Sequence, residues 1–184
     1  ICQALLSVAR AEEQAPAERV ALAEVVEETL AAMARDLSKD GIRLIREVPA
    51  SLEVVTRPAE LKQVLLNLLL NARWAAMQRG SGQSIRISAA RSGDQVRLRV
   101  SDTGIGIPRE NLQRIFEAFF TTKGKEGSGL GLAFCREVVE ELGGRLTVRS
   151  QEGKGSCFTV ALPLAPAEAS GDSAPRRRER CPAG

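Results

Sequence analysis

Two asparagines, Asn67 and Asn71, stand four residues apart in the otherwise apolar run from Val64 to Ala72. In a helix this spacing places both amides on one face. A buried amide without a partner costs ~1–3 kcal/mol, so one interpretation is a pair of core amides bonded to neighbouring backbone. The other is a polar stripe that faces a ligand, in which the amide oxygen of Asn71 binds a hard cation such as Mg²⁺.

A second group of residues begins with Asp102, which follows an alternating strand pattern and opens the sequence Asp-Thr-Gly-Ile-Gly-Ile-Pro, residues 102–108. An aspartate before glycines at a strand end is compatible with a simple turn. A buried carboxylate there can also accept a hydrogen bond from an exocyclic amine, while Gly104 and Gly106 let the backbone approach a flat ring.

The third group is the segment Phe-Glu-Ala-Phe-Phe-Thr-Thr-Lys, residues 116–123, followed by Gly-Ser-Gly-Leu-Gly-Leu, residues 127–132, at a predicted helix start. Glycines before a helix present free N–H groups and a positive dipole end to phosphate, and Lys123 can add a charge. A flexible surface loop without a ligand can have a similar glycine-rich sequence. A Rossmann site is disfavoured because no strand directly precedes these glycines, and the absence of a Gly-Lys-Ser/Thr sequence excludes a P-loop.

The composition excludes several function classes. The 184 residues include no histidine, which rules out histidine-based acid–base catalysis and a phosphohistidine within the chain. With a net charge of +3, one Trp, five Phe and no Tyr, a nucleic-acid interface is not expected. The apolar runs are too short to cross a bilayer. The four cysteines are typical of a protein in a reducing compartment. The start at Ile1 is what we expect of a fragment.

Local patterns predict the elements that must position these groups. Helices are expected at 1–13, 22–37, 58–79 and 130–142, with a short one near 110–116. Strands are expected at 42–48, 84–91, 95–101, 145–150 and 156–162, and residues after Pro163 are expected to be disordered. This order predicts an α+β fold in two layers, with helices on one face of a mixed, mostly antiparallel sheet.

The motifs in this order resemble the catalytic domain of sensor histidine kinases, members of the Bergerat-fold ATPases. In that family the asparagine helix, the Asp-Thr-Gly-Ile-Gly-Ile-Pro segment, the Phe-rich segment and the second glycine segment are the N box, first glycine box, F box and second glycine box. The resemblance covers roughly residues 17–164 and extends through Gly-Gly-Arg-Leu-Thr-Val-Arg-Ser, residues 143–150. It implies residues 1–14 as the end of a dimerisation-domain helix, 15–164 as an ATP-binding catalytic domain and 165–184 as a tail.

The resemblance also implies roles for individual residues. Asp102 would bind the adenine amino group and Asn71 would hold Mg²⁺ on the phosphates. Thr121 to Ser128 would form a mobile ATP lid, and Lys123 would grip the terminal phosphates. The implied nucleotide-binding set is Asn67, Asn71, Asp102, Gly104, Gly106, Ile107, Thr121, Thr122, Lys123, Gly127, Ser128, Gly129, Leu130, Gly131 and Leu132, with Asn67 and Lys123 as its catalytic members.

The side chain at position 67 helps to distinguish phosphate transfer from ATP hydrolysis. Hydrolytic relatives carry a Glu one turn before the Mg²⁺ asparagine, whereas an amide cannot act as a general base. The resemblance therefore implies transfer of the γ-phosphate to a histidine on a dimerisation domain outside this chain, for relay to a response regulator, in the cytoplasm. A serine kinase of the anti-sigma type and an inactive nucleotide-binding module are the alternatives. Trp74, Arg57 and Ala118 depart from common residues of the family, and Arg73, beside Trp74, is expected to be solvated rather than bound to phosphate.

Overall fold

The computed structural model describes residues 16–33, 37–124 and 127–165. The predicted helix at residues 1–13 lies outside the described residues, as does the predicted tail except for Ala165. That residue is buried, and its N–H donates to Glu53 O at 3.3 Å. The folded part therefore extends to at least Ala165.

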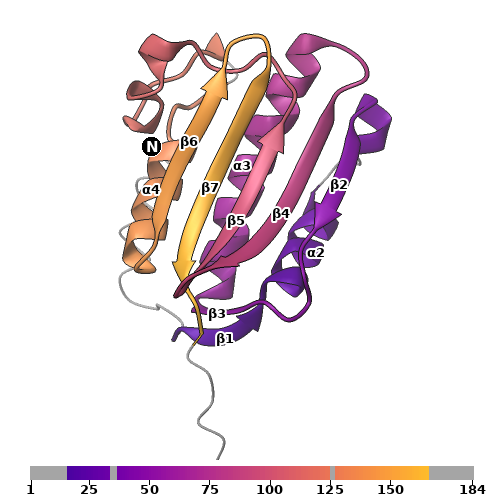
Figure 1. Ribbon diagram of the computed structural model, residues 1–184. Coiled ribbons are helices and arrows are strands. Elements are labelled where there is room, and N and C mark those ends of the chain that lie inside the picture. Colours follow the sequence, from indigo (N-terminus) through magenta and orange to yellow (C-terminus); the bar gives the residue numbers. More distant parts are fainter. Residues whose placement is uncertain (1–15, 34–36, 125–126, 166–184) are drawn as a thin grey trace, which may run out of the picture.

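A five-stranded sheet forms one layer, in the order β2 (Arg43–Glu47), β4 (Ser84–Ser92), β5 (Gln95–Asp102), β7 (Gly155–Pro163) and β6 (Arg145–Gln151) (Figure 1). Strands β2 and β4 are parallel, and the other neighbours are antiparallel. This confirms the mixed, mostly antiparallel sheet. The predicted strand ends agree with the observed ones to within a residue or two.

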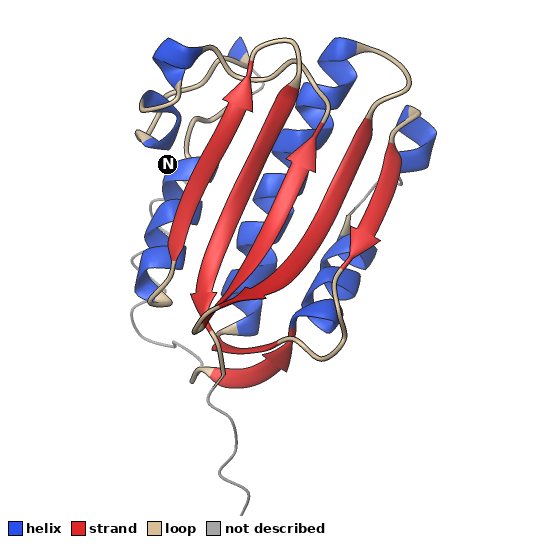
Figure 2. Cartoon of the chain, viewed as in Figure 1, coloured by secondary structure: helices blue, strands red, loops and turns tan. Residues whose placement is uncertain are grey.

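A layer of helices covers one face of the sheet (Figure 2). They are α2 (Leu22–Ala32), α3 (Pro58–Arg79) and α4 (Gly131–Glu141). The strands alternate buried and accessible residues because side chains in a strand point to opposite faces. The buried set includes Ile85, Ile87, Leu98, Val100, Phe158 and Val160 on the strands. None of the helices in the described residues is long and apolar enough to span a bilayer.

The central helix α3 supplies much of the core and thereby fixes the site. Its buried side chains are Leu61, Val64, Leu65, Leu68, Leu69, Ala72 and Ala76. Full burial of a leucine or valine stabilises a fold by about 1.5–3 kcal/mol, so the rotation of α3 about its axis is strongly fixed. The residues of α3 between these apolar positions consequently have defined directions.

The structure differs from the sequence prediction in three places. A two-stranded antiparallel sheet of β1 (Glu18–Ala21) and β3 (Glu53–Thr56) was not predicted, because four-residue strands show too few alternations. Helix α2 ends at Ala32, and Leu37 belongs to a separate 3₁₀ turn, Leu37–Asp40, which buries it on the same core. The short helix near 110–116 is two 3₁₀ turns, Arg109–Asn111 and Arg114–Phe116.

Candidate nucleotide-binding site

A cavity of about 500 Å³ opens between α3, the end of β5, the segment that follows β5, and the start of α4. A volume of this size suits an organic ligand of a few hundred daltons. The residues that line it are Asn67, Leu70, Asn71, Trp74, Ala75, Asp102, Ile105, Gly106, Ile107, Pro108, Ile115, Phe120, Thr121, Thr122, Lys123, Gly127, Ser128, Gly129, Gly131, Leu132, Glu152, Ser156 and Phe158.

The two asparagines of α3 lie on the cavity wall, at its junction with α4. The Asn71 Oδ1 atom accepts a hydrogen bond from Lys123 Nζ. The same ammonium lies 5.1 Å from the centroid of the Trp74 ring, within the range of a cation–π contact. Asn67 faces the first residue of α4, since a Cβ built on Gly131 would lie 3.9 Å from Asn67 Cγ. Both amides therefore belong to a polar stripe that faces the cavity.

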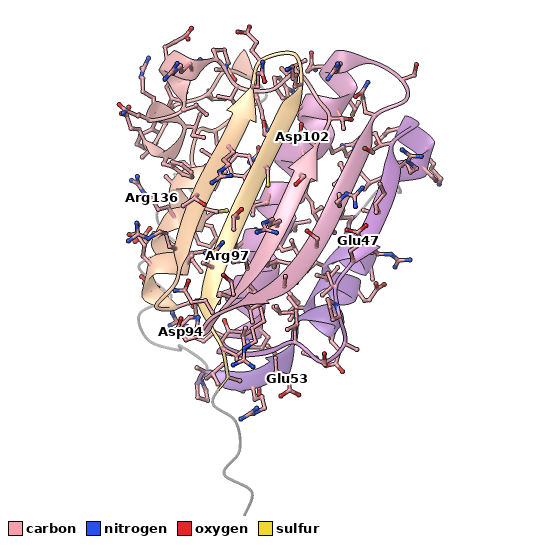
Figure 3. The ribbon with its side chains drawn as sticks, viewed as in Figure 1. Glu47, Glu53, Asp94, Arg97, Asp102 and Arg136 are labelled. Atoms are coloured by element: carbon pink, nitrogen blue, oxygen red, sulfur yellow. The ribbon has the colours of Figure 1, made fainter. Side chains whose placement is uncertain are left out.

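Asp102 closes the opposite side of the cavity, at the end of β5 (Figure 3). Its side chain is buried, and its Oδ1 atom accepts the N–H of Gly104 at 2.8 Å. Burial raises the pKa of this carboxyl group above its usual value, and backbone N–H groups of Gly104, Ser156 and Asp102 itself oppose the rise. The site thus holds a hydrogen-bond acceptor in a poorly solvated position.

The segment after Asp102 packs directly on α3. A Cβ built on Gly104 would lie 2.4 Å from the carbonyl carbon of Ala75, so only glycine fits there. The N–H of Ile105 donates to Ala75 O at 3.2 Å. Gly104 therefore contributes to the site by allowing this segment to pack against α3, and it does not itself line the cavity.

The hairpin between β6 and β7 supports the same segment from the other side. Gly153 N–H donates to Ile105 O at 2.6 Å, and Ile107 N–H donates to Ser150 Oγ at 2.8 Å. Gly106 has φ 71°, and a Cβ on it would lie 2.1 Å from Gln151 O. The backbone around the cavity is consequently held on two sides.

The glycines before α4 are close to the Phe-rich segment. Phe119 N–H donates to Gly129 O at 3.0 Å, and a Cβ on Gly129 would lie 2.4 Å from the Phe119 carbonyl carbon. Helix α4 begins at Gly131, and its N-cap residue, Leu130, makes no side-chain capping bond. An uncapped helix start offers N–H groups and the positive end of a dipole. This end of the cavity, with Lys123, suits an anion.

Of the fifteen predicted nucleotide-binding residues, the structure brings thirteen to the cavity wall; Gly104 and Leu130 are outside it. The sequence interpretation missed hairpin residues Glu152, Ser156 and Phe158, because only the pairing of β5 with β7 places Ser156 opposite Asp102. Ile105, Pro108 and Phe120 also line the cavity, and each lies inside a motif that the sequence had singled out.

Two further observations concern charge and metal binding. Arg73, next to the cavity residue Trp74, does not line the cavity. Its side chain is 23% exposed and forms an ion pair with the buried Asp40 carboxylate at 2.5 Å, so it is only partly the solvated charge that the sequence predicted. No group of three or more His, Cys, Asp or Glu side chains that could hold a metal occurs in the described parts of the chain. The Asn71 amide oxygen already contacts an ammonium cation, and one such oxygen fits Mg²⁺ that takes its other ligands from phosphate and water.

Residues 56–166 match the family described as histidine kinase-, DNA gyrase B- and HSP90-like ATPase. The chain is 49% identical over 112 residues to the sensor histidine kinase ZraS of Escherichia coli K12, covering 61% of this chain and 23% of that protein. It is 41% identical over 152 residues to the two-component sensor PprA of Pseudomonas aeruginosa, covering 79% of this chain and 16% of that protein. The chain thus spans less than a third of the length of these two relatives.

Solved structures agree with the sequence matches. The catalytic domain of histidine kinase ThkA superposes with a TM-score of 0.70 at 31% identity, covering 81% of this chain and 96% of that one. Full-length ShkA in complex with AMPPNP gives 0.71 at 26% identity, covering 84% of this chain and 32% of that one. The chain belongs to the family of histidine kinase-, DNA gyrase B- and HSP90-like ATPases, and within it to the ATP-binding catalytic domains of sensor histidine kinases.

Proposed function

We propose that this domain binds Mg·ATP in the cavity and donates the γ-phosphate to a histidine on a dimerisation domain that is not part of this chain. The observation that carries the proposal is the arrangement of the cavity: a buried carboxylate at one side, and Asn71, Lys123 and the uncapped start of α4 at the other. A nucleotide has the complementary pattern, with an amino group on its base and a chain of phosphates.

Adenine is assigned to the side of Asp102. The ionised carboxylate accepts a hydrogen bond from the exocyclic amino group, and a bond to a charged acceptor is stronger than one between neutral groups. Ile105, Gly106 and Ile107 line the cavity there, so backbone and aliphatic side chains can cover the faces of the ring. A base that carries an oxygen in place of the amino group would leave the buried carboxylate facing another acceptor, which disfavours guanine.

The phosphates are assigned to the start of α4. The N–H groups at Gly129 and Gly131 and the ammonium of Lys123 supply positive charge there. Thr121, Thr122, Gly127 and Ser128, which we assign to an ATP lid, line the same cavity. Asn71 would hold Mg²⁺, which neutralises phosphate charge when bound. The ammonium of Lys123 would then leave the Asn71 oxygen and contact phosphate. The complex of the relative ShkA with AMPPNP supports a nucleotide in the corresponding cavity.

Phosphate transfer is favoured over hydrolysis because none of the described residues that line the cavity places a base near the phosphates. The ionisable lining residues in the described part of the chain are Asp102, Lys123 and Glu152. Glu152 lies beside Gly106, at the adenine side: a Cβ on Gly106 would lie 3.0 Å from the Glu152 Cα. Asn67 carries an amide, which cannot take a proton from water. Catalysis by the domain is thus positioning and charge neutralisation.

The remaining partners follow from the relatives. ZraS and PprA are named as sensors, and we assign to the parent of this chain a homodimer that passes phosphate to a response regulator in the cytoplasm. Residues 15–164 form the catalytic domain in this scheme, and the buried Ala165 packs with them. Residues 1–14 end the helix of the dimerisation domain, and the residues after Ala165 are a tail.

The test is incubation of the domain and γ-labelled Mg·ATP with a separately purified dimerisation domain from the same gene. Acid-labile phosphate on that partner, absent with Asn71→Ala, is the expected result. Acid-stable phosphoserine on another protein would instead indicate a serine kinase of the anti-sigma type. ATP binding without transfer to any partner would leave an inactive nucleotide-binding module.

A further inference from the structure

Arg79 is the last residue of α3, and its side chain reaches the segment that follows Asp102. Its Nη1 atom donates to Thr103 O at 2.8 Å and to Gly104 O at 3.3 Å. An exposed arginine in the last turn of a helix usually contacts solvent or the carbonyl groups of its own helix. Here the guanidinium instead contacts two consecutive carbonyl groups of another segment.

The first of those carbonyls belongs to the peptide group that also carries the Gly104 N–H. That N–H donates to Asp102 Oδ1 at 2.8 Å. One peptide group therefore lies between the guanidinium on its oxygen side and the carboxylate on its nitrogen side. A cation on the oxygen polarises the peptide, which strengthens its N–H as a donor. The positions of Arg79 and of the Asp102 carboxylate are linked through this peptide.

We propose that Arg79 is a positioning and specificity-determining residue for the base, which holds the Thr103–Gly104 peptide so that the Asp102 carboxylate stays aimed at the amino group. This inference rests on the proposed function. Arg79 does not line the cavity and acts only through the peptide and Asp102. Loss of its side chain would let the peptide rotate, and the carboxylate would then no longer be held toward the adenine amino group. Selectivity for adenine over guanine should fall as a result.

The fold does not depend on Arg79. Gly104 still packs against Ala75, and Ile105 N–H still donates to Ala75 O at 3.2 Å. Arg79 is exposed, and hydrogen bonds of exposed groups contribute little to net stability. A substitution here should consequently leave the segment attached to α3 while it loosens one peptide.

Among the described residues, few other charged groups lie near Asp102. Glu152 on the β6–β7 hairpin and Lys123 on the lid line the same cavity. Lys154 lies on the same hairpin, two residues after Glu152, but does not line the cavity. Arg86 of β4 lies on the open face of the sheet, where it forms an ion pair with Glu47. A change in the pH dependence of binding after substitution of Arg79 can therefore be assigned to the peptide link when Glu152 and Lys123 are unaltered.

The experiment is calorimetric titration of Mg·ATP and Mg·GTP into the whole chain and into Arg79→Ala, Arg79→Lys and Arg97→Ala. Arg97 is a matched control, because it is an exposed arginine of β5 on the open face of the sheet, away from the cavity (Figure 3). We expect Arg79→Ala to weaken ATP binding about three- to tenfold, which corresponds to one charge-assisted hydrogen bond, and to leave GTP binding unchanged. Arg79→Lys should restore most of the ATP preference, and Arg97→Ala should bind as the wild type does.

An unchanged ratio of ATP to GTP affinity in Arg79→Ala would overturn the inference while the proposed function stands, whether both affinities stay the same or both fall by the same factor. As a second measurement, the acidic limb of adenosine binding should move to higher pH in Arg79→Ala, because the weakened Gly104 N–H stabilises the carboxylate less. An unshifted limb would also count against the inference. A wild-type chain that binds neither nucleotide would refute the proposed function and this inference together.

Discussion

Replacement of Gly104 by alanine tests the contact that attaches the adenine side of the cavity to α3. The added Cβ would lie 2.4 and 2.5 Å from the carbonyl carbon and oxygen of Ala75 and 2.7 Å from Ala76 N. All three atoms belong to the backbone of a helix that is fixed by its buried leucines, so they cannot move aside. The segment after Asp102 must instead shift away by about 1 Å to reach ordinary contact distance.

The cost can be estimated from the contacts that change. Over-packing in a filled interior costs about 1–3 kcal/mol, and loss of the 3.2 Å bond from Ile105 N–H to Ala75 O adds about 0.5–1.5 kcal/mol. We therefore expect Gly104→Ala to lower the free energy of unfolding by roughly 2–4 kcal/mol and Tm by about 5–15 °C. Because the Gly104 N–H moves with the segment, ATP affinity should fall by about tenfold or more.

The assays are thermal unfolding and calorimetric titration of Mg·ATP, with Gly93→Ala as the control. Gly93 lies in the turn that precedes β5, has φ 66° and has no atom within 4 Å of a built Cβ. Gly93→Ala should cost only about 1–2 kcal/mol of backbone strain and leave ATP affinity unchanged. Gly104→Ala with the stability and affinity of the wild type would refute the packing argument.

Three further predictions concern titratable groups of the site and core. The Asp102 pKa is raised by burial, so adenosine binding should weaken as pH falls through that raised value, and Asp102→Asn should abolish this pH dependence. This loss of binding does not come from unfolding. A carboxyl group with a raised pKa takes up its proton more readily in the folded state, so the free energy of unfolding increases as pH falls through that pKa. Circular dichroism over the same pH range checks that the chain stays folded. Burial raises the pKa of the Cys135 thiol to about 12, so iodoacetamide at neutral pH should modify the partly exposed Cys157 well before Cys135, as peptide mapping by mass spectrometry would show. Lys123→Met should weaken ATP binding about tenfold or more and leave adenosine binding nearly unchanged, and equal losses for the two ligands would argue against a phosphate contact.

The sequence was sufficient to predict the parts of the fold that carry strong local signals. The 22-residue helix α3 has an apolar pattern, a proline in its first turn and a glycine at its end, and the observed bounds are Pro58–Arg79. The alternating strands β4 and β5 and the hairpin of β6 and β7 were recognisable for the same reason. The faces of Asn67 and Asn71 follow from helix periodicity once the apolar residues of α3 are known to be buried.

Other features depend on contacts between segments that are distant in the sequence. The parallel pairing of β2 with β4 and the small sheet of β1 and β3 leave no local pattern. Glu152 reaches the cavity only because β5, β7 and β6 are neighbours, and Arg79 reaches Thr103 only because the segment after β5 packs on α3. Arg73 could not be assigned from sequence either, since its partner Asp40 lies in a 3₁₀ turn 33 residues earlier.

The most direct measurement for the proposed function is calorimetric titration of Mg·ATP into the wild-type chain and into Asp102→Ala. One nucleotide per chain, bound with micromolar affinity by the wild type and at least about tenfold more weakly by Asp102→Ala, is the predicted result. Undiminished binding in Asp102→Ala, or no binding by the wild type, would contradict the assignment of this cavity to ATP.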